Sequence, residues 1–231
     1  LRYSLPREIS EMGYIWSEEN KFKIWFEIEK LACKAQCALG VVPSHIMEAF
    51  EKKIDFDIDR INQIESEVKH DVIAFLTYIS ETIGIDISYM HYGMTSSDVL
   101  DTCLSIQLKM SADILLQNIE NILETLKIRA QEAKYFVCIG RSHGVHAEIT
   151  TFGLKLARFY SEFKRNYERL KLAKDEISIC KISGAVGNFA NIDPAVEMHV
   201  AKSLGLKQET ISSQVIPRDR HAMFFATLGV I

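Results

Sequence analysis

The chain has 231 residues, of which 48% are hydrophobic and 25% are charged, and its net charge is −4. This length suits one large domain or two smaller ones with a buried core. No run approaches the roughly 18 apolar residues of a membrane span, and the first residues lack the basic-then-apolar pattern of a signal peptide. The acidic balance argues against a broad basic face for nucleic acid. We therefore expect a soluble, cytoplasmic protein that binds neither membrane nor nucleic acid.

The cysteines argue against a disulfide framework, because they are odd in number and scattered along the chain. Two of them lie one helical turn apart, but no second pair completes a zinc-binding set. We expect reduced, buried thiols at Cys33, Cys37, Cys103, Cys138 and Cys180.

Short helices are predicted in the N-terminal part of the chain. Ser17 can cap a helix that Gly40 closes. Further short helices are suggested over residues 45–52, 58–66 and 69–83. We expect these helices to form an N-terminal domain over residues 1–92.

Two much longer helices follow. No proline lies between Pro43 and Pro194, and proline breaks helix interiors. Apolar residues at helical spacing predict an amphipathic helix from Ser97 to about Lys134, about 55 Å long at 1.5 Å per residue. A second helix, antiparallel to the first, is predicted from about Thr150 to Ile179.

The fold class expected from these patterns is all-α, with a long-helix bundle over residues 93–231. Loops are predicted at residues 92–97, 135–148 and 183–192, and period-two strand patterns are almost absent. Two long helices with apolar stripes need further helices to cover them. We therefore expect a bundle that is incomplete at its C-terminal end, or one that other subunits complete.

Titratable side chains gather between two glycines in GRSHGVHAE, from Gly140 to Glu148. His143 and His146 could do acid–base chemistry, because the histidine pKa lies near neutral pH. The stretch could also be a simple turn. The zinc motif of a helix has histidines four residues apart, whereas here the spacing is three on a glycine-broken segment, so we expect no metal.

Hydroxyl groups are concentrated in HYGMTSSD, from His91 to Asp98. Thr95, Ser96 and Ser97 stand at the predicted start of a long helix, where carboxylates or phosphates bind favourably. The alternative is ordinary N-capping by Ser97, which needs only one hydroxyl.

Three further segments have both a structural and a functional interpretation. Arg2 and Tyr3 could grip a phosphate or belong to a solvated terminus. His70, between Lys69 and Asp71, opens an apolar helix and could be a cap or a functional group. The SGAVGN segment, residues 183–188, is interpreted as a turn, although its glycines would also let a substrate approach the backbone.

Taken together, six motifs in order resemble the adenylosuccinate lyases of the aspartase/fumarase superfamily of helical lyases. The resemblance covers essentially the whole chain. It implies a homotetramer with active sites each built from three chains, no cofactor, and β-elimination of fumarate from adenylosuccinate, giving AMP, and from succinyl-aminoimidazole-carboxamide ribotide, giving AICAR. The motifs are RYS, KHDVIAF, HYGMTSSDVLDT, GRSHGVHAEITTFG, SGAVGNFAN and SQVIPRDRHA.

The resemblance also implies roles for individual residues. His143 is the acid that protonates the departing nitrogen, and His70 supports it or orients the substrate. Arg2 and Tyr3 hold the phosphate, Thr95 and Ser96 hold the carboxylate on the fumarate side, and Gln214 positions the succinyl group. The substrate-binding set also includes Lys69, Asp71, His91 and Ser142.

The chain departs from the family pattern in three places. The mobile loop of Ser-Ser-x-Met-Pro-x-Lys-x-Asn type, whose serine is regarded as the catalytic base, is missing, so we expect the isolated chain to be inactive. Ser142 stands where threonine is more common and keeps the hydroxyl. Pro217 replaces a polar residue, which affects the expected start of the following helix.

Two other functions are considered. One is another lyase or cycloisomerase of the superfamily, of the carboxymuconate cycloisomerase type, although RYS and HYGMTSSD favour the purine branch. The other is a non-catalytic helical scaffold fragment, which would not need clustered hydroxyls and two histidine-containing segments.

Overall fold

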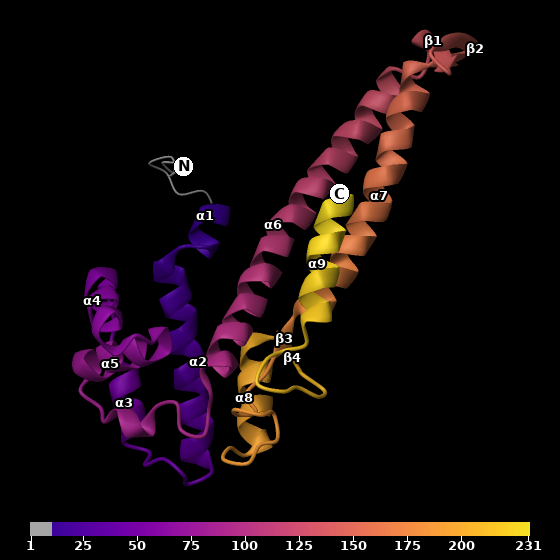
Figure 1. The fold of residues 1–231 in the computed structure, drawn as a ribbon. Coiled ribbons are helices and arrows are strands. Elements are labelled where there is room, and N and C mark those ends of the chain that lie inside the picture. The colour runs from indigo at the N-terminus through magenta and orange to yellow at the C-terminus, as the bar shows by residue number, and fades with distance from the viewer. Residues whose placement is uncertain (1–10) are drawn as a thin grey trace. The chain divides into compact units, whose positions relative to one another are not determined.

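The computed structural model describes residues 11–231, which form two compact units (Figure 1). Unit 1 contains the described residues up to Leu108 together with Ser178–Arg218, and unit 2 contains Lys109–Ile177 and Asp219–Ile231. Helices dominate both units, which confirms the predicted fold class. The domain boundary expected between residues 92 and 93 stays a prediction. Within the described residues, no helix is long and apolar enough to cross a membrane.

Unit 1 consists mainly of short helices, with α4 packed on α5 and α2 packed on α8. The two-residue strands β3 and β4 also belong to unit 1 and pair in parallel, with Ile179 opposite Lys207. The elements in chain order are α1 (Glu11–Ile15), α2 (Glu18–Ala38), α3 (Ile46–Phe50), α4 (Ile58–Val68), α5 (Asp71–Ile83), the 3-10 helix η1 (Ile87–Tyr89), the first part of α6 (Ser96–Glu132), β3 (Ile179–Cys180), α8 (Pro194–Leu204) and β4 (Lys207–Gln208).

Side-chain caps and glycines bound these helices. The predicted cap Ser17 accepts a hydrogen bond of 3.2 Å from the Asn20 amide at the start of α2. That helix ends at Ala38, just before Gly40. Gly84 ends α5 with a φ of 76°, a left-handed conformation that glycine adopts without steric cost.

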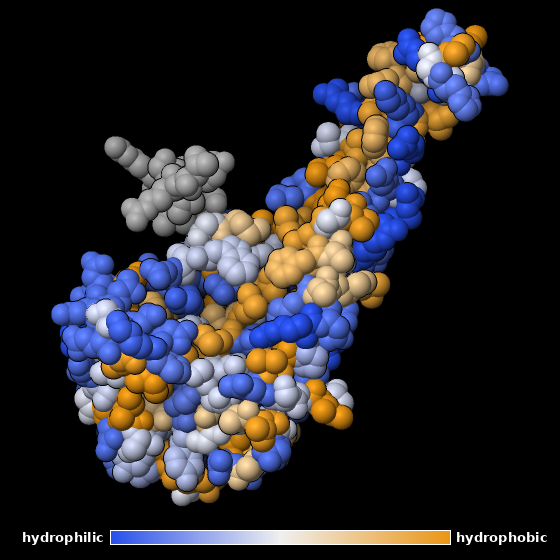
Figure 2. All heavy atoms as spheres, viewed as in Figure 1, coloured by the Kyte–Doolittle hydropathy of each residue, from blue (hydrophilic) through white to orange (hydrophobic). Residues whose placement is uncertain are grey.

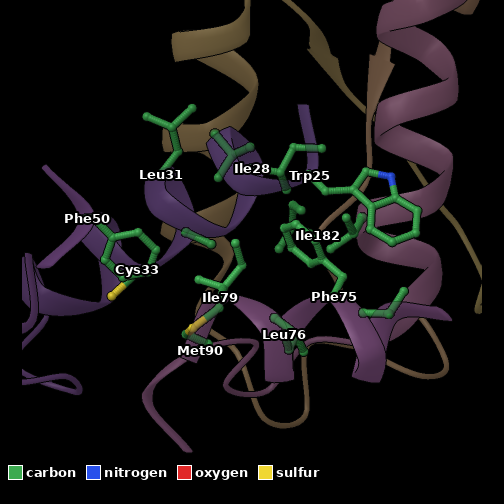
Figure 3. Packing of buried hydrophobic residues seen from close by; sticks show 14 of the residues in the cluster. Trp25, Ile28, Leu31, Cys33, Phe50, Phe75, Leu76, Ile79, Met90 and Ile182 are labelled. Carbon is green, nitrogen blue, oxygen red and sulfur yellow. The ribbon is translucent and has the colours of Figure 1, made fainter. Parts of the chain in front are cut away.

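The hydrophobic core of unit 1 contains several aromatic side chains, among them Trp25 and Phe75 (Figure 3). The ring of Trp25 lies edge-on to those of Phe22 and Phe75, with centroid distances of 5.4 Å in both pairs. Replacing a buried phenylalanine by alanine typically costs about 3–5 kcal/mol. Ile182 belongs to the same core, so the loop that follows it starts from a fixed position.

Unit 2 is built on two antiparallel helices, as predicted. The rest of α6 runs beside α7 (Phe152–Ile177), and the Tyr167 hydroxyl donates to Glu120 over 2.7 Å. A Cβ on Gly153 would come within 2.6 Å of the Ala130 carbonyl oxygen, so glycine allows the end of α6 and the start of α7 to pack closely. The remaining elements are β1 (Val137–Ser142), β2 (Val145–Thr151) and most of α9 (Arg218–Val230).

The loop predicted over residues 135–148 is wrong, because most of this segment is a β-hairpin. Strands β1 and β2 pair antiparallel, with Ser142 opposite Val145. His143 and Gly144 form the two-residue turn, with φ angles of 53° and 75° as a type I′ turn requires. The register shifts at Gly140, between Ile139 and Arg141. Period two is weak in this sequence because both faces of the hairpin are largely exposed.

Unit 2 leaves many large apolar side chains open to solvent. Figure 2 shows hydrophobic residues along the visible face of α6, α7 and α9. Burial of such groups is the main stabilising contribution in packed helices, so this surface is suited to covering by other helices. The exposed large apolar residues of unit 2 include Ile122, Ile128, Leu154, Leu172, Met223, Phe225 and Val230.

Candidate functional site

A buried ion pair at the start of α6 connects two loops of unit 1. Lys181 Nζ lies 2.5 Å from Asp98 Oδ1, and both side chains are 0% exposed. Lys181 also donates to the Gly184 carbonyl oxygen over 2.8 Å. A lysine is rarely buried unless its charge is paired, so the Asp98 carboxylate is what allows Lys181 to lie here.

Asp98 accepts hydrogen bonds from three backbone amides in addition to the lysine. The amide of Thr95 donates to it over 2.9 Å, that of Ser183 over 3.2 Å and that of Gly184 over 3.1 Å. Ser97 lies inside α6, which begins at Ser96, so the alternative of ordinary N-capping by Ser97 does not hold. The Asp98 side chain instead accepts from the Thr95 amide before the helix. One carboxylate thus fixes both the 91–95 turn and the 181–184 segment.

A second buried carboxylate holds the same segment from α8. Glu197 accepts from the Ile182 amide over 2.8 Å and from the Gln208 side chain over 3.3 Å. Burial raises the pKa of Glu197, although these two hydrogen bonds oppose the shift. The backbone from Lys181 to Gly184 is therefore anchored from two sides.

Two glycines allow the loops of unit 1 to touch. Gly93 has a φ of 72°, and a Cβ there would come within 2.1 Å of the Asn191 carbonyl oxygen. Gly187 has a φ of 76°, and its Cβ would come within 2.3 Å of the Ser212 carbonyl oxygen. The turn interpretation of residues 183–188 is consistent with this geometry, and the turn serves close backbone packing.

His70 has a structural role and also contacts a hydroxyl of α6. Its Nδ1 accepts from the Ile73 amide over 3.4 Å, so it caps α5. Its Nε2 lies 3.3 Å from Ser96 Oγ. With Nδ1 accepting the Ile73 amide, Nε2 is the ring nitrogen that can hydrogen-bond to Ser96. Both interpretations of His70 therefore remain compatible with the geometry.

The neighbours of His70 lie beside it. Asp71 is half-buried, and its carboxylate lies 3.4 Å from His70 Nδ1. Lys69 is exposed and ends α4 in a left-handed conformation with a φ of 57°. Lys69, His70 and Asp71, all predicted site residues, therefore follow one another from the end of α4 to the first residue of α5.

His91 is held by a buried carboxylate. Its Nδ1 lies 2.6 Å from Glu29 Oε1, and its amide donates to Glu29 Oε2 over 3.0 Å. Burial opposes protonation of the ring, but the hydrogen bond and the charge of Glu29, with a smaller contribution from Asp98, raise the pKa of His91 above its ordinary value. His91 has a φ of 58°, so this contact fixes an unusual backbone conformation.

Gln214 lies on an exposed segment that is fixed on either side. Ser212 Oγ lies 3.0 Å from Ser183 Oγ, and the Ile216 amide donates to Asp101 over 2.7 Å. Helix α9 begins at Arg218, directly after Pro217, so the helix start follows the proline without disruption. The side chain of Gln214 is exposed.

Ser142 and His143 lie on the hairpin of unit 2, and both are exposed. A non-glycine residue with a positive φ, such as His143, is uncommon, and histidine is among the residues that tolerate it. The turn therefore projects the imidazole into solvent at a defined position. Neither unit by itself contains both predicted catalytic histidines, because His70 belongs to unit 1 and His143 to unit 2.

Arg2 and Tyr3 lie outside the described residues. Within residues 11–231, no group of three or more histidine, cysteine, aspartate or glutamate side chains is placed to hold a metal ion.

The buried carboxylates and the buried lysine have little local signal in the sequence. Lys181 interrupts the apolar run from Ile179 to Ile182, and a single charge in such a run signals a buried partner. Asp98 ends a hydroxyl-rich motif, which gives no sign of its burial. Glu29 and Asp101 lie on helices with no local signal, since their partners are far away in the sequence.

Comparison with known proteins finds similarity over almost the whole chain, as the sequence motifs predict. A family model described as lyase matches residues 5–231. The adenylosuccinate lyase of Bacillus subtilis (strain 168) is 51% identical over 230 residues, covering 100% of this chain and 52% of the relative. The adenylosuccinate lyase of Streptococcus mutans is 49% identical with the same coverage. The chain thus spans about half the length of the curated relatives it matches.

Solved structures share the fold. A 3-carboxy-cis,cis-muconate lactonizing enzyme from Pseudomonas putida superposes with a TM-score of 0.86 at 24% identity, covering 95% of this chain and 52% of that one. A β-carboxy-cis,cis-muconate cycloisomerase from Acinetobacter calcoaceticus superposes with a TM-score of 0.84 at 27% identity, covering 95% and 54%. At 24% identity, the likeness to the Pseudomonas putida enzyme shows a shared fold and does not indicate a shared function.

Proposed function

Because the chain belongs to the lyase family, we propose that the protein containing it is an adenylosuccinate lyase. The proposed reaction releases fumarate from adenylosuccinate, giving AMP, and from succinyl-aminoimidazole-carboxamide ribotide, giving AICAR. The observation that carries the proposal is 51% identity to a curated adenylosuccinate lyase over 100% of this chain. The muconate-processing neighbours, at 24% and 27% identity, give no comparable support for a cycloisomerase.

The proposed chemistry is a β-elimination. A base removes a proton from the succinyl carbon next to a carboxylate, the electron pair forms the double bond of fumarate, and the C–N bond breaks. His143 is proposed as the acid that protonates the departing nitrogen. Its place in a two-residue turn supports this role, since the turn holds the imidazole at a defined and accessible position. The base is proposed to come from protein outside this chain.

Thr95 and Ser96 are proposed to bind the carboxylate on the fumarate side. They stand at the N-terminal end of α6, where the helix dipole favours an anion. The 3.3 Å contact between Ser96 Oγ and His70 Nε2 supports a role for His70 in orienting that hydroxyl. Thr95 cannot offer its backbone amide, since this amide already donates to Asp98.

Further substrate contacts are proposed for residues in several parts of the chain. Gln214 is proposed to position the succinyl group, and its segment is joined to the 183–187 loop by the pair of serine hydroxyls at 183 and 212. Arg2 and Tyr3 are proposed to hold the phosphate. Lys69, Asp71, His91 and Ser142 complete the proposed substrate-binding set.

A homotetramer that shares its active sites between subunits is also proposed. The exposed apolar residues of unit 2 support this proposal, because partner helices from other subunits would cover them. A cytoplasmic location is proposed, as for an enzyme acting on free nucleotides.

The direct test uses the full-length protein, extended to the length of its relatives. We expect it to release fumarate and AMP in equal amounts from adenylosuccinate, and fumarate from the carboxamide substrate. A carboxymuconate substrate serves as the control and should be unchanged. Turnover of the muconate without turnover of adenylosuccinate would reject the proposal in favour of a cycloisomerase.

A further inference from the structure

We propose that Lys181 is a positioning residue that neutralises Asp98 and thereby makes the start of α6 able to receive the substrate carboxylate. This inference rests on the proposed function, because it takes the carboxylate at Thr95 and Ser96 as its premise. The observation behind it is the fully buried Lys181–Asp98 pair, which the sequence motifs by themselves leave without a role.

Asp98 creates a conflict at this place. Its carboxylate is needed to hold the turn, because it accepts from the amides of Thr95, Ser183 and Gly184. The same negative charge lies in the first turn of α6, within three residues of the two hydroxyls proposed to bind an anion. A carboxylate that binds there meets a like charge, which disfavours binding.

Lys181 resolves the conflict without taking part in substrate binding. Its ammonium group contacts Asp98 Oδ1 at 2.5 Å and the Gly184 carbonyl oxygen at 2.8 Å. Its side chain is fully buried. It therefore cancels the charge of Asp98 while leaving all three amides on that carboxylate. The loops keep their geometry, and the anion site keeps the favourable field of the helix start.

The burial of both partners strengthens the effect. Interactions between charges are screened weakly away from water, so an unneutralised Asp98 would act on its surroundings more strongly than an exposed carboxylate. The Lys30–Glu51 pair provides the contrast within unit 1, since its charged groups lie 3.0 Å apart with side chains 24% and 71% exposed. Exposed pairs of this kind contribute little.

The experiment compares two ligands in the full-length enzyme. Lys181→Met removes the charge at similar length, and Lys181→Gln removes it while keeping hydrogen-bonding capacity. For each we expect the Kd of fumarate and the KM of adenylosuccinate to rise about tenfold or more, because a like charge in close proximity shifts ionic equilibria by that factor. The Kd of AMP, which lacks the succinyl carboxylates, should stay within about twofold. Calorimetry measures both dissociation constants.

Two further variants separate this role from a structural one. Lys30→Met is the matched control and should leave both dissociation constants unchanged. In the double variant Asp98→Asn/Lys181→Met no unneutralised charge remains, but the side chain at position 98 keeps only one acceptor oxygen for the backbone amides. Fumarate should therefore bind more tightly than to Lys181→Met and less tightly than to the wild type. A purely structural role would instead lower the active fraction, and hence kcat, with KM and both dissociation constants unchanged.

The outcomes distinguish the inference from the proposed function. If wild-type enzyme releases no fumarate from adenylosuccinate, the proposed function fails before Lys181 is tested. If the wild type is active but Lys181→Gln weakens fumarate and AMP equally, or weakens neither, the role of Lys181 is overturned. Failure of Lys181→Met to fold leaves the test to Lys181→Gln, whose ligand selectivity decides the matter.

Discussion

Two glycine turns of this protein share one backbone conformation and have opposite surroundings. Gly93 in unit 1 and Gly144 in unit 2 have φ angles of 72° and 75°. A Cβ on Gly93 would collide with the Asn191 carbonyl oxygen, whereas nothing lies within 4 Å of one on Gly144. The turn in unit 1 is fixed by contacts of the chain with itself. The two residues of the hairpin turn, His143 and Gly144, are exposed.

The same contrast extends to the polar groups of each region. In unit 1, buried carboxylates bind the loops together, and Asp98 holds the Thr95 amide, the Ser183 amide and the Lys181 ammonium group. On the hairpin, Ser142, His143 and His146 are exposed. The loops of unit 1 are therefore fixed by contacts within the unit, whereas the polar side chains of the hairpin are open to solvent.

The largest expected effect concerns whether the 231-residue chain can catalyse the reaction without further protein. The isolated 231-residue chain should show no fumarate release, because an acid without its base leaves the carbon-bound proton in place. Mixing and refolding it with full-length His143→Gln protein should restore part of the activity, since the chain supplies His143 and the partner supplies the base. Fumarate production is followed in the mixture and in each protein alone.

Robust turnover by the isolated chain would contradict this expectation. It would place the base among the residues present here and remove the argument for shared sites.

The next effect concerns the hairpin itself. In the full-length enzyme, His143→Gln should lower kcat by about 10²- to 10⁴-fold, the usual contribution of a general acid. The control is His45→Gln, which makes the same change at an exposed histidine whose side chain forms no cap hydrogen bond. Steady-state kinetics with adenylosuccinate provide the measurement. Near-normal turnover of the His143 variant would remove its assignment as the acid.

A pair of glycine substitutions tests the contrast most directly. Gly93→Ala should destabilise unit 1 by about 2–5 kcal/mol, combining left-handed strain of about 1–2 kcal/mol with overpacking of about 1–3 kcal/mol. Gly144→Ala carries the strain alone and should cost only about 1–2 kcal/mol. Chemical unfolding of the two variants measures the difference. Equal losses of unfolding free energy in the two variants would show that the close packing around Gly93 does not contribute to stability.

The smallest effect depends on pH. The folded pKa of His91 lies above its ordinary value of about 6.5, so its stabilising contact with Glu29 is complete below that pH and is lost as the pH rises through the folded value. His91→Asn, which tolerates the positive φ, should therefore lower stability by about 1.5–3 kcal/mol at pH 6 and by less at pH 9. Thermal unfolding at the two pH values measures this.

A variant of His45, which is exposed, serves as the control for this comparison. His45→Asn should show no such pH dependence. A larger loss for His91→Asn at pH 9 than at pH 6 would reverse the assigned sign and reject the charged contact.

The long helices were predictable because their signal is repeated many times within a short stretch of sequence. The predicted first helix, from Ser97 to about Lys134, corresponds to α6 at Ser96–Glu132, and α7 lies within two residues of its predicted ends. The hairpin at residues 137–151 was not predicted, because with both faces exposed its side chains have no need to alternate between apolar and polar.

The sequence by itself determined the helical class, the main helix ends and the motifs by which the family is recognised, since each depends on residues close together in the chain. Only the tertiary structure decided which polar groups meet. Lys181 and Asp98 are separated by 83 residues, and Glu29 and His91 by 62. No local pattern specifies such partners, because an unpaired charge becomes costly only where it is buried, and burial exists only once the helices have packed.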